Sequence, residues 1–140
     1  WGDYHADLDQ KSAHDLFAGR TNEEMQIHFR RCPIERTDEL RWMPEVPFRY
    51  YMLGFRDFVM SGNFDYGYAP DAASCFIGLV EEKLIKQPRL ILPIMPELLP
   101  TVEYVATHQS EFEATEHIYG NFIEKFDRIK ALYQEKIRSK

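Results

Sequence analysis

The stretch "PFRYYMLGFRDFVMSG" (residues 47–62) constrains the fold most, because it reads as a helix that is apolar over most of its circumference. At 3.6 residues per turn, one broad face collects Phe48, Tyr51, Met52, Phe55, Phe58 and Val59. Tyr50, Gly54, Asp57 and Ser61 form the opposite, weakly polar strip. We expect this helix at the centre of a small bundle, with Gly54 letting a neighbouring backbone approach.

Other segments carry helix signals of their own. Thr21 and Glu24 have the spacing of a capping box ahead of "MQIHFRR", and Pro33 and Pro44 bound a short helix. Apolar residues recur at helical spacing in "DAASCFIGLVEEKLIKQ" (residues 71–87). Four prolines divide residues 88–100 into short turns, and a further helix runs from Pro96 or Pro100 to about Gln109. The sequence therefore predicts an all-α, single-domain bundle of five to seven helices over residues 1–140.

The C-terminal segment, residues 110–138, predicts a long helix. Ser110 and Glu113 have capping-box spacing, and an apolar stripe at steps of three and four contains Phe112, Tyr119, Phe122, Phe126, Ile129 and Tyr133. Gly120 weakens the helix and can break it, with Asn121 restarting it. The stripe packs on the rest of the domain or forms a dimer seam, and we expect the former, so the chain is a monomer or a homodimer.

Composition narrows the class of protein. Of 140 residues, 44% are hydrophobic and 14% aromatic, which is ample for a core. The longest apolar run, "LILPIM", is too short for a membrane span, and no signal peptide is visible. Two cysteines without a disulfide pattern favour a reducing compartment, so we expect a soluble cytoplasmic protein. A net charge of −6 argues against nucleic-acid binding and favours a partner with a basic surface.

No familiar catalytic pattern is present. The five histidines form no pair at a spacing of three or four residues, and Glu-x-x-His does not occur. The chain has no glycine-rich phosphate loop and no G-x-S-x-G sequence, and neither Cys32 nor Cys75 has a histidine close in sequence. We therefore expect no catalytic residue, no metal site and no cofactor.

One region is similar to known proteins. The residues "ELRWMPEVPFRYYMLGFRDFV" (39–59), followed by the apolar helix "DAASCFIGLV", resemble a group of small bacterial helical domains of unknown function. The resemblance covers residues 39–80. It implies a bacterial helical fold and supplies no catalytic residue.

Arginines gather in one half of the chain. Between residues 20 and 56 there are seven arginines and no lysine. Arg49 and Arg56 accompany the apolar helix, and a buried guanidinium needs a negative partner. The candidates within the chain are Asp57, Glu45, Asp38 and Glu39. The other possibility is an anion site at the helix edge, formed with Tyr50 beside the loop that carries Tyr66 and Tyr68.

Two functions remain open. The first is a non-enzymatic protein-binding module, such as an inhibitor or immunity-type protein, which covers a basic partner. Its surface would be the loop with Tyr66 and Tyr68 or the acidic residues Glu111, Glu113, Glu116 and Asp127. In a purely structural alternative, Phe64 would tuck under the bundle edge and Tyr66 would stack on it. The second function is a small-molecule or anion-binding domain that uses Arg49, Arg56 and Tyr50.

Overall fold

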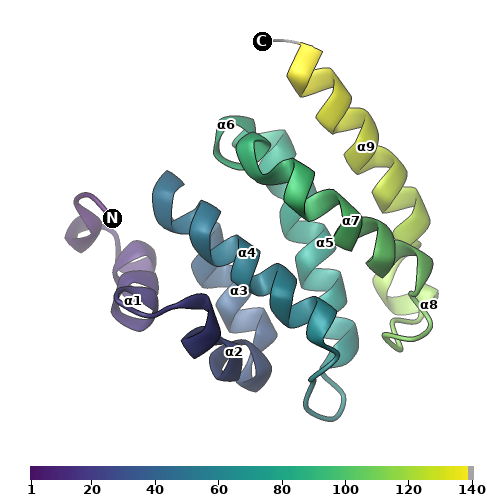
Figure 1. The fold of residues 1–140 in the computed structure, drawn as a ribbon, viewed down its shortest axis with the longest axis horizontal. Coiled ribbons are helices and arrows are strands. Elements are labelled where there is room, and N and C mark those ends of the chain that lie inside the picture. Colours follow the sequence, from purple (N-terminus) through teal and green to yellow (C-terminus); the bar gives the residue numbers. More distant parts are fainter. Residues whose placement is uncertain (139–140) are drawn as a thin grey trace.

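The structure is a computed structural model that describes residues 1–138, and it consists of helices joined by short connections (Figure 1). The elements are η1 (Tyr4–Ala6), α1 (Leu8–Phe17), α2 (Asn22–Arg31), α3 (Pro33–Arg41), α4 (Glu45–Ser61), α5 (Ala69–Lys86), α6 (Pro88–Ile91), η2 (Leu92–Ile94), α7 (Met95–Thr107), α8 (Glu116–Tyr119) and α9 (Phe122–Arg138). Residues 1–138 contain no strand, and seven of their helices have nine or more residues. The predicted all-α bundle is confirmed.

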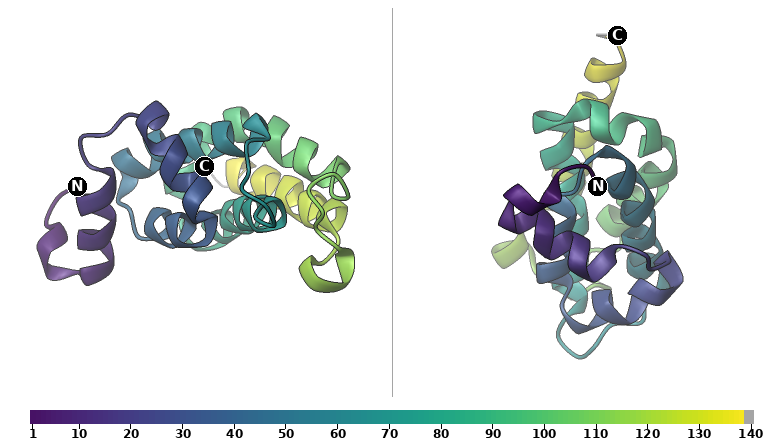
Figure 2. Two further views of the ribbon diagram at one scale, coloured as in Figure 1. Left: turned by 90° about the horizontal axis from the view of Figure 1, so that it is seen from below. Right: turned by 90° about the vertical axis from the view of Figure 1, so that its left-hand side faces the viewer.

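The helices form two layers. One layer contains α2, α4 and α7, in which α4 packs against both neighbours. The other contains α1, α3, α5 and α9, each packed against the next. The view from below in Figure 2 shows the two layers edge on, with the C-terminal half of the chain at the far end from α1. Across the layers, α3 packs against α2 and α4, α5 against α4 and α7, and α9 against α7, so the chain crosses between the layers along its length.

Aromatic side chains fill the space between the layers. The Phe55 ring stacks on Phe29 of α2 with 5.2 Å between ring centroids, and it meets Phe76 of α5 edge to face at 5.6 Å. All six residues of the predicted apolar face of α4 are buried, which confirms that face. One hydrophobic cluster runs from Ala13 in α1 to Ile129 in α9. The aromatic stretch is thus mainly core.

Gly54 has a role that differs from the expected one. It is buried, and the group that approaches it is the Asn22 side chain of α2 rather than a backbone. Asn22 Nδ2 donates to the Tyr50 carbonyl at 2.9 Å, and Gln26 Nε2 donates to the Gly54 carbonyl at 3.0 Å. These two amides bind α2 to the backbone of α4. The Thr21–Glu24 capping box, which is confirmed, starts α2 at this contact.

The C-terminal segment contains the predicted long helix with the break at Gly120 that the sequence allowed, but its helical part starts at Glu116 rather than at residue 110. Residues 108–115 form turns and a short connection, Glu113 has a positive φ of 59°, and Ser110 caps no helix, so the second capping box was wrong. Gly120, with a φ of 80°, separates α8 from α9, and Asn121 accepts from the Glu124 amide at 3.0 Å as the helix restarts. The turns persist because the Gln109 side chain donates to two carbonyls of this segment and accepts from the Phe122 amide.

The proline-rich stretch agrees with expectation in its main features. Two short elements, α6 and η2, precede α7, which starts at Met95 beside the predicted Pro96, but the three elements follow one another without interruption and Pro100 lies inside α7. Pro88, Pro93 and Pro96 lie in the first turns of these elements, where proline costs no hydrogen bond. Pro88–Thr107 is consequently long and apolar enough to cross a membrane by length and composition, and more than half of its most apolar window is buried in the fold. The core helix of a folded domain meets the same criterion.

A matched pair of glycine substitutions tests the α2–α4 contact. A Cβ at Gly54 would lie 2.2 Å from Asn22 Oδ1, whereas one at Gly78 in α5 would meet nothing within 4 Å. We expect Gly54→Ala to lower the free energy of unfolding by about 1–3 kcal/mol. Gly78→Ala should raise the free energy of unfolding by about 0.5–1 kcal/mol, because alanine loses less conformational entropy than glycine when the helix forms. Urea denaturation measures both, and equal effects would contradict the close approach of Asn22.

Candidate functional site

The aromatic loop, residues 62–68, combines an anchor with an exposed tip. The Phe64 ring meets Phe58 at 5.2 Å and Phe112 at 5.9 Å between centroids, so it tucks against the bundle as the structural alternative expected. Tyr66 does not stack on it, because its side chain is completely exposed, with a relative exposure of 104%. Tyr68 is 39% exposed. The loop therefore presents a tyrosine to solvent on a rigid base.

The acidic residues lie on the neighbouring turn. Glu111 and Glu113 belong to residues 108–115, Glu116 begins α8, and all three are exposed. Phe112, between the two glutamates, is buried and fixes the turn to the bundle. Glu116 accepts from Asn121 Nδ2 at 3.1 Å. The backbone of this segment thus turns its carboxylates outward.

A small pocket lies where the loop meets the turn, and we call it the loop–turn pocket. Its volume is about 250 Å³, and its walls are Val59, Met60, Gly62, Phe64, Tyr104, Glu111 and Phe112. The Tyr104 ring stands edge-on to Phe112 at 6.1 Å and stacks on His108 at 4.0 Å. Glu111 is the charged residue of this apolar lining. The fold thereby joins the two surfaces that the sequence offered as alternatives.

Arg49 and Arg56 have partners within the chain. Arg49 forms an ion pair with Glu45 at 2.7 Å and donates to the carbonyls of Leu90 and Arg89 in α6, at 3.0 and 2.8 Å. Arg56 pairs with Asp57 at 2.9 Å and donates to the Glu97 carbonyl at 3.5 Å. Both guanidinium groups therefore tie α4 to the α6–α7 segment.

Tyr50 contacts α2 rather than the α6–α7 segment. Its hydroxyl accepts from the Asn22 amide at 3.1 Å, at the N-terminus of α2. Arg49, Arg56 and Tyr50 consequently reach three different parts of the chain. The structure does not bring the three residues of the predicted anion site together.

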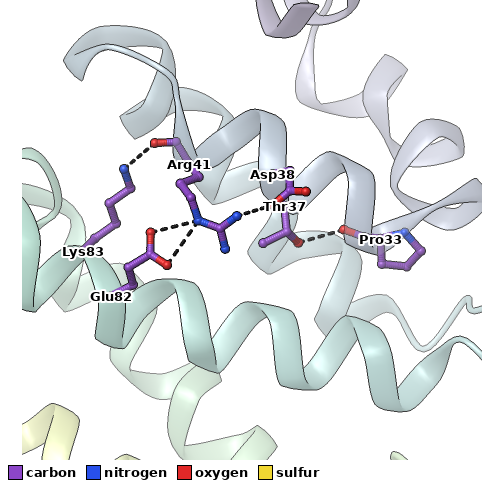
Figure 3. A network of polar contacts seen from close by, with 6 residues as sticks. All are labelled: Pro33, Thr37, Asp38, Arg41, Glu82 and Lys83. Carbon is purple, nitrogen blue, oxygen red and sulfur yellow. Dashed lines mark hydrogen bonds and ion pairs between the residues drawn. The ribbon is translucent and has the colours of Figure 1, made fainter. Parts of the chain in front are cut away.

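Sequence reasoning missed a polar network at the other end of the bundle (Figure 3). Arg41, the last residue of α3, donates from Nε to both carboxylate oxygens of Glu82 in α5, at 3.1 and 2.9 Å, and also pairs with Asp38. Lys83 Nζ donates to the Arg41 carbonyl at 2.6 Å and to Gln87 Oε1 at 2.5 Å. The C-terminal end of α3 is thus bound to α5 by two adjacent residues.

Lys83 is unusual among the lysines because it is only 1% exposed. Its ammonium lies 5.4 Å from the centroid of the Phe48 ring and donates to two neutral oxygens. Burial lowers the pKa of Lys83 to about 8. A sequence signal was available, since Lys83 follows Leu79 and Val80 at spacings of four and three on the apolar face of α5.

The remaining metal-binding and nucleophilic side chains do not form a site. Residues 1–138 hold no group of three or more His, Cys, Asp or Glu side chains placed to share a metal ion. Cys32 and Cys75 are free thiols, and burial raises the pKa of Cys75, which makes it less nucleophilic at neutral pH.

Comparison of the chain with protein-family models, with curated proteins and with solved structures finds no match. The similarity of residues 39–80 to small bacterial helical domains therefore stays a prediction.

The buried amine predicts a specific pH dependence of stability. Unfolded Lys83 has an ordinary pKa near 10.5, so between about pH 8 and 10.5 the unfolded chain binds more protons than the folded chain. The penalty for burying the ammonium is present below pH 8 and vanishes as the pH rises through this interval. Relative to Lys83→Met, the wild type should gain up to about 3 kcal/mol of unfolding free energy. Urea denaturation across the interval measures this gain.

Lys86→Met is the control, because Lys86 lies close by in sequence and is exposed. The difference in unfolding free energy between the wild type and Lys83→Met should change with pH much more than the difference between the wild type and Lys86→Met. The same pH response for both variants would mean that the Lys83 amine is not desolvated.

Proposed function

We propose that this protein is a non-enzymatic protein-binding module that captures a basic segment of its partner at the loop–turn pocket. The observation that carries the proposal is the contact between Phe64 and Phe112, which places the exposed aromatic loop beside the acidic turn. Two features that each favour a protein partner thereby form one surface. An arginine or lysine side chain of the partner is the group that this surface suits best.

The lining of the pocket matches an amphipathic cationic side chain. The hydrocarbon stem of arginine or lysine would pack on Met60, Phe64 and Val59. Its charged head would reach the Glu111 carboxylate at the rim and the half-exposed Tyr104 ring. An exposed cation–π contact contributes about 0.5–1 kcal/mol, and a charge-assisted hydrogen bond adds to it.

The surroundings extend the surface and favour the same partner. Tyr66 stands free beside the anchor at Phe64, and tyrosine is enriched at binding hot spots because it buries a large area at low entropy cost. Glu113 and Glu116 add negative charge on the turn and on α8, and the whole chain carries −6. A basic partner would be steered to this end of the molecule by long-range attraction.

An inhibitor or immunity-type role in the cytoplasm is the finer form of this proposal. It is supported by the acidic charge and by the two free thiols, which suit a reducing compartment. The anion-binding alternative would require Arg49 and Arg56 to leave the carboxylates and carbonyls that they now contact. We therefore retain protein binding as the proposed function.

Charge reversal at the pocket tests the proposal. We expect a short peptide of alternating arginine and alanine to shift amide NMR signals of residues 59–64 and 104–112, and Glu111→Lys to abolish these shifts. Glu103→Lys is the matched control. Glu103 is exposed like Glu111, but it lies on α7 and lines a separate depression with Phe126 and Lys130. Shifts spread evenly over all acidic residues, or equal effects of both variants, would show only nonspecific attraction.

The exposed tyrosines give a second test. Changing Tyr66 and Tyr68 together to alanine should weaken peptide binding while changing the free energy of unfolding by less than about 1 kcal/mol, as exposed side chains usually do. Denaturation and the NMR titration on the same variant separate the two effects. Marked destabilisation would assign the loop to the core and leave the acidic turn as the remaining surface.

A further inference from the structure

A second cavity lies at the opposite end of the α4–α5 pair from the loop–turn pocket. Its volume is about 560 Å³, and its walls come from the end of α3, the start of α4 and the junction of α5 with α6. The residues of its lining that bear on its chemistry are Arg41, Trp42, Glu82, Lys83, Lys86 and Gln87. Gln10 and Glu45, which pairs with Arg49, complete the polar lining. The cavity therefore combines an indole, two carboxylates, two amides and three cationic groups.

The Lys83 amine is the buried nucleophile of this cavity. No carboxylate is bonded to it, since its acceptors are the Arg41 carbonyl and Gln87 Oε1. Gln87 is itself exposed, so one of the two groups that accept a hydrogen bond from the amine lies at the surface of the cavity. With a pKa of about 8, about a quarter of the amine is neutral at pH 7.5, against about one part in a thousand for an ordinary lysine.

The positive charges of the cavity favour a ligand that carries a negatively charged group. The Lys86 ammonium is exposed, and it has no ion-pair partner among residues 1–138. Arg41 already forms ion pairs with Glu82 and Asp38, so Lys86 is the cationic group available to bind a ligand anion. Trp42, which is 45% exposed, offers an apolar wall.

From this arrangement we propose that Lys83 is a covalent attachment site for a small carbonyl compound that carries a carboxylate, such as a 2-oxo acid. The carbonyl carbon would bond to Lys83 Nζ, and the carboxylate would face Lys86. The site is independent of the loop–turn pocket. It uses the amine for its nucleophilicity rather than for its charge.

The chemistry needs no oxidant or reductant. The neutral amine adds to the carbonyl carbon, and as the C–N bond forms the carbonyl π electrons move to oxygen. Glu82, which lines the same cavity, takes a proton from nitrogen and delivers it to that oxygen, which gives a carbinolamine. Glu82 then supplies a proton drawn from solvent to the hydroxyl group, water leaves, and the protonated imine remains. All steps are reversible.

Reductive trapping tests the site directly. The folded wild-type protein is incubated with pyruvate and sodium cyanoborohydride near pH 7.5, and the modified lysines are identified by peptide mass mapping. We expect Lys83 to be labelled at least about tenfold faster than any exposed lysine, because its larger neutral fraction outweighs its lower basicity. Labelling spread over the exposed lysines, with Lys83 unmodified, would overturn the proposal.

Two variants and a neutral probe refine the result. Lys83→Met should lose the fast labelling. Lys86→Met should lose the preference for pyruvate over acetone, while labelling of Lys83 by acetone slows only modestly, because Lys86 is the smallest of the causes that lower the pKa of Lys83. An unchanged preference in Lys86→Met would overturn the assignment of the carboxylate to Lys86. The mapping of the wild-type chain decides the role of Lys83 even where Lys83→Met fails to fold.

Discussion

The structure depends on the burial of Phe55 between Phe29 and Phe76. Phe29, Phe55 and Phe76 come from α2, α4 and α5, so one aromatic cluster, with a stacked and an edge-to-face contact, joins both layers. With α4 held in this way, its C-terminal end carries the aromatic loop and its N-terminal end borders the Lys83 cavity. Each ring buries a large apolar area, and aromatic pairs add about 0.5–1.5 kcal/mol beyond that area.

The two proposed sites lie at opposite ends of the α4–α5 pair. A helix of the length of α4, which has 17 residues, spans about 25 Å, so a ligand in one site does not touch the other. The loop–turn pocket is the smaller of the two and has Glu111 in its lining, whereas the other cavity holds a buried amine and Lys86, a cation without an ion-pair partner among residues 1–138. The first suits recognition of a protein surface, and the second suits a small reactive molecule.

Local sequence patterns were sufficient for most helices, since the apolar face of α4 and the Thr21 capping box follow from residues close in the chain. The turns at 108–115 could not be predicted, because they depend on hydrogen bonds from Gln109 to residues as distant as Gly120 and Phe122. Arg49 and Arg56 were recognised as needing partners, but their backbone acceptors in α6 and α7 are a tertiary feature. Lys83 was overlooked because a lysine is usually solvated, although its position on an apolar face marks it.

The order in which the helices pack has a kinetic consequence. Three of the four most extensive helix contacts, α2 with α4, α3 with α5 and α7 with α9, join helices separated by a single helix along the chain, whereas the contact of α5 with α9 closes a longer stretch. The two ends of the described chain lie far apart in Figure 1. Few long loops must therefore close before stabilising contacts form. Helical chains rich in local contacts fold within microseconds to milliseconds, so we expect α2–α5 to associate early and α9 to dock last, once α5 and α7 are in place.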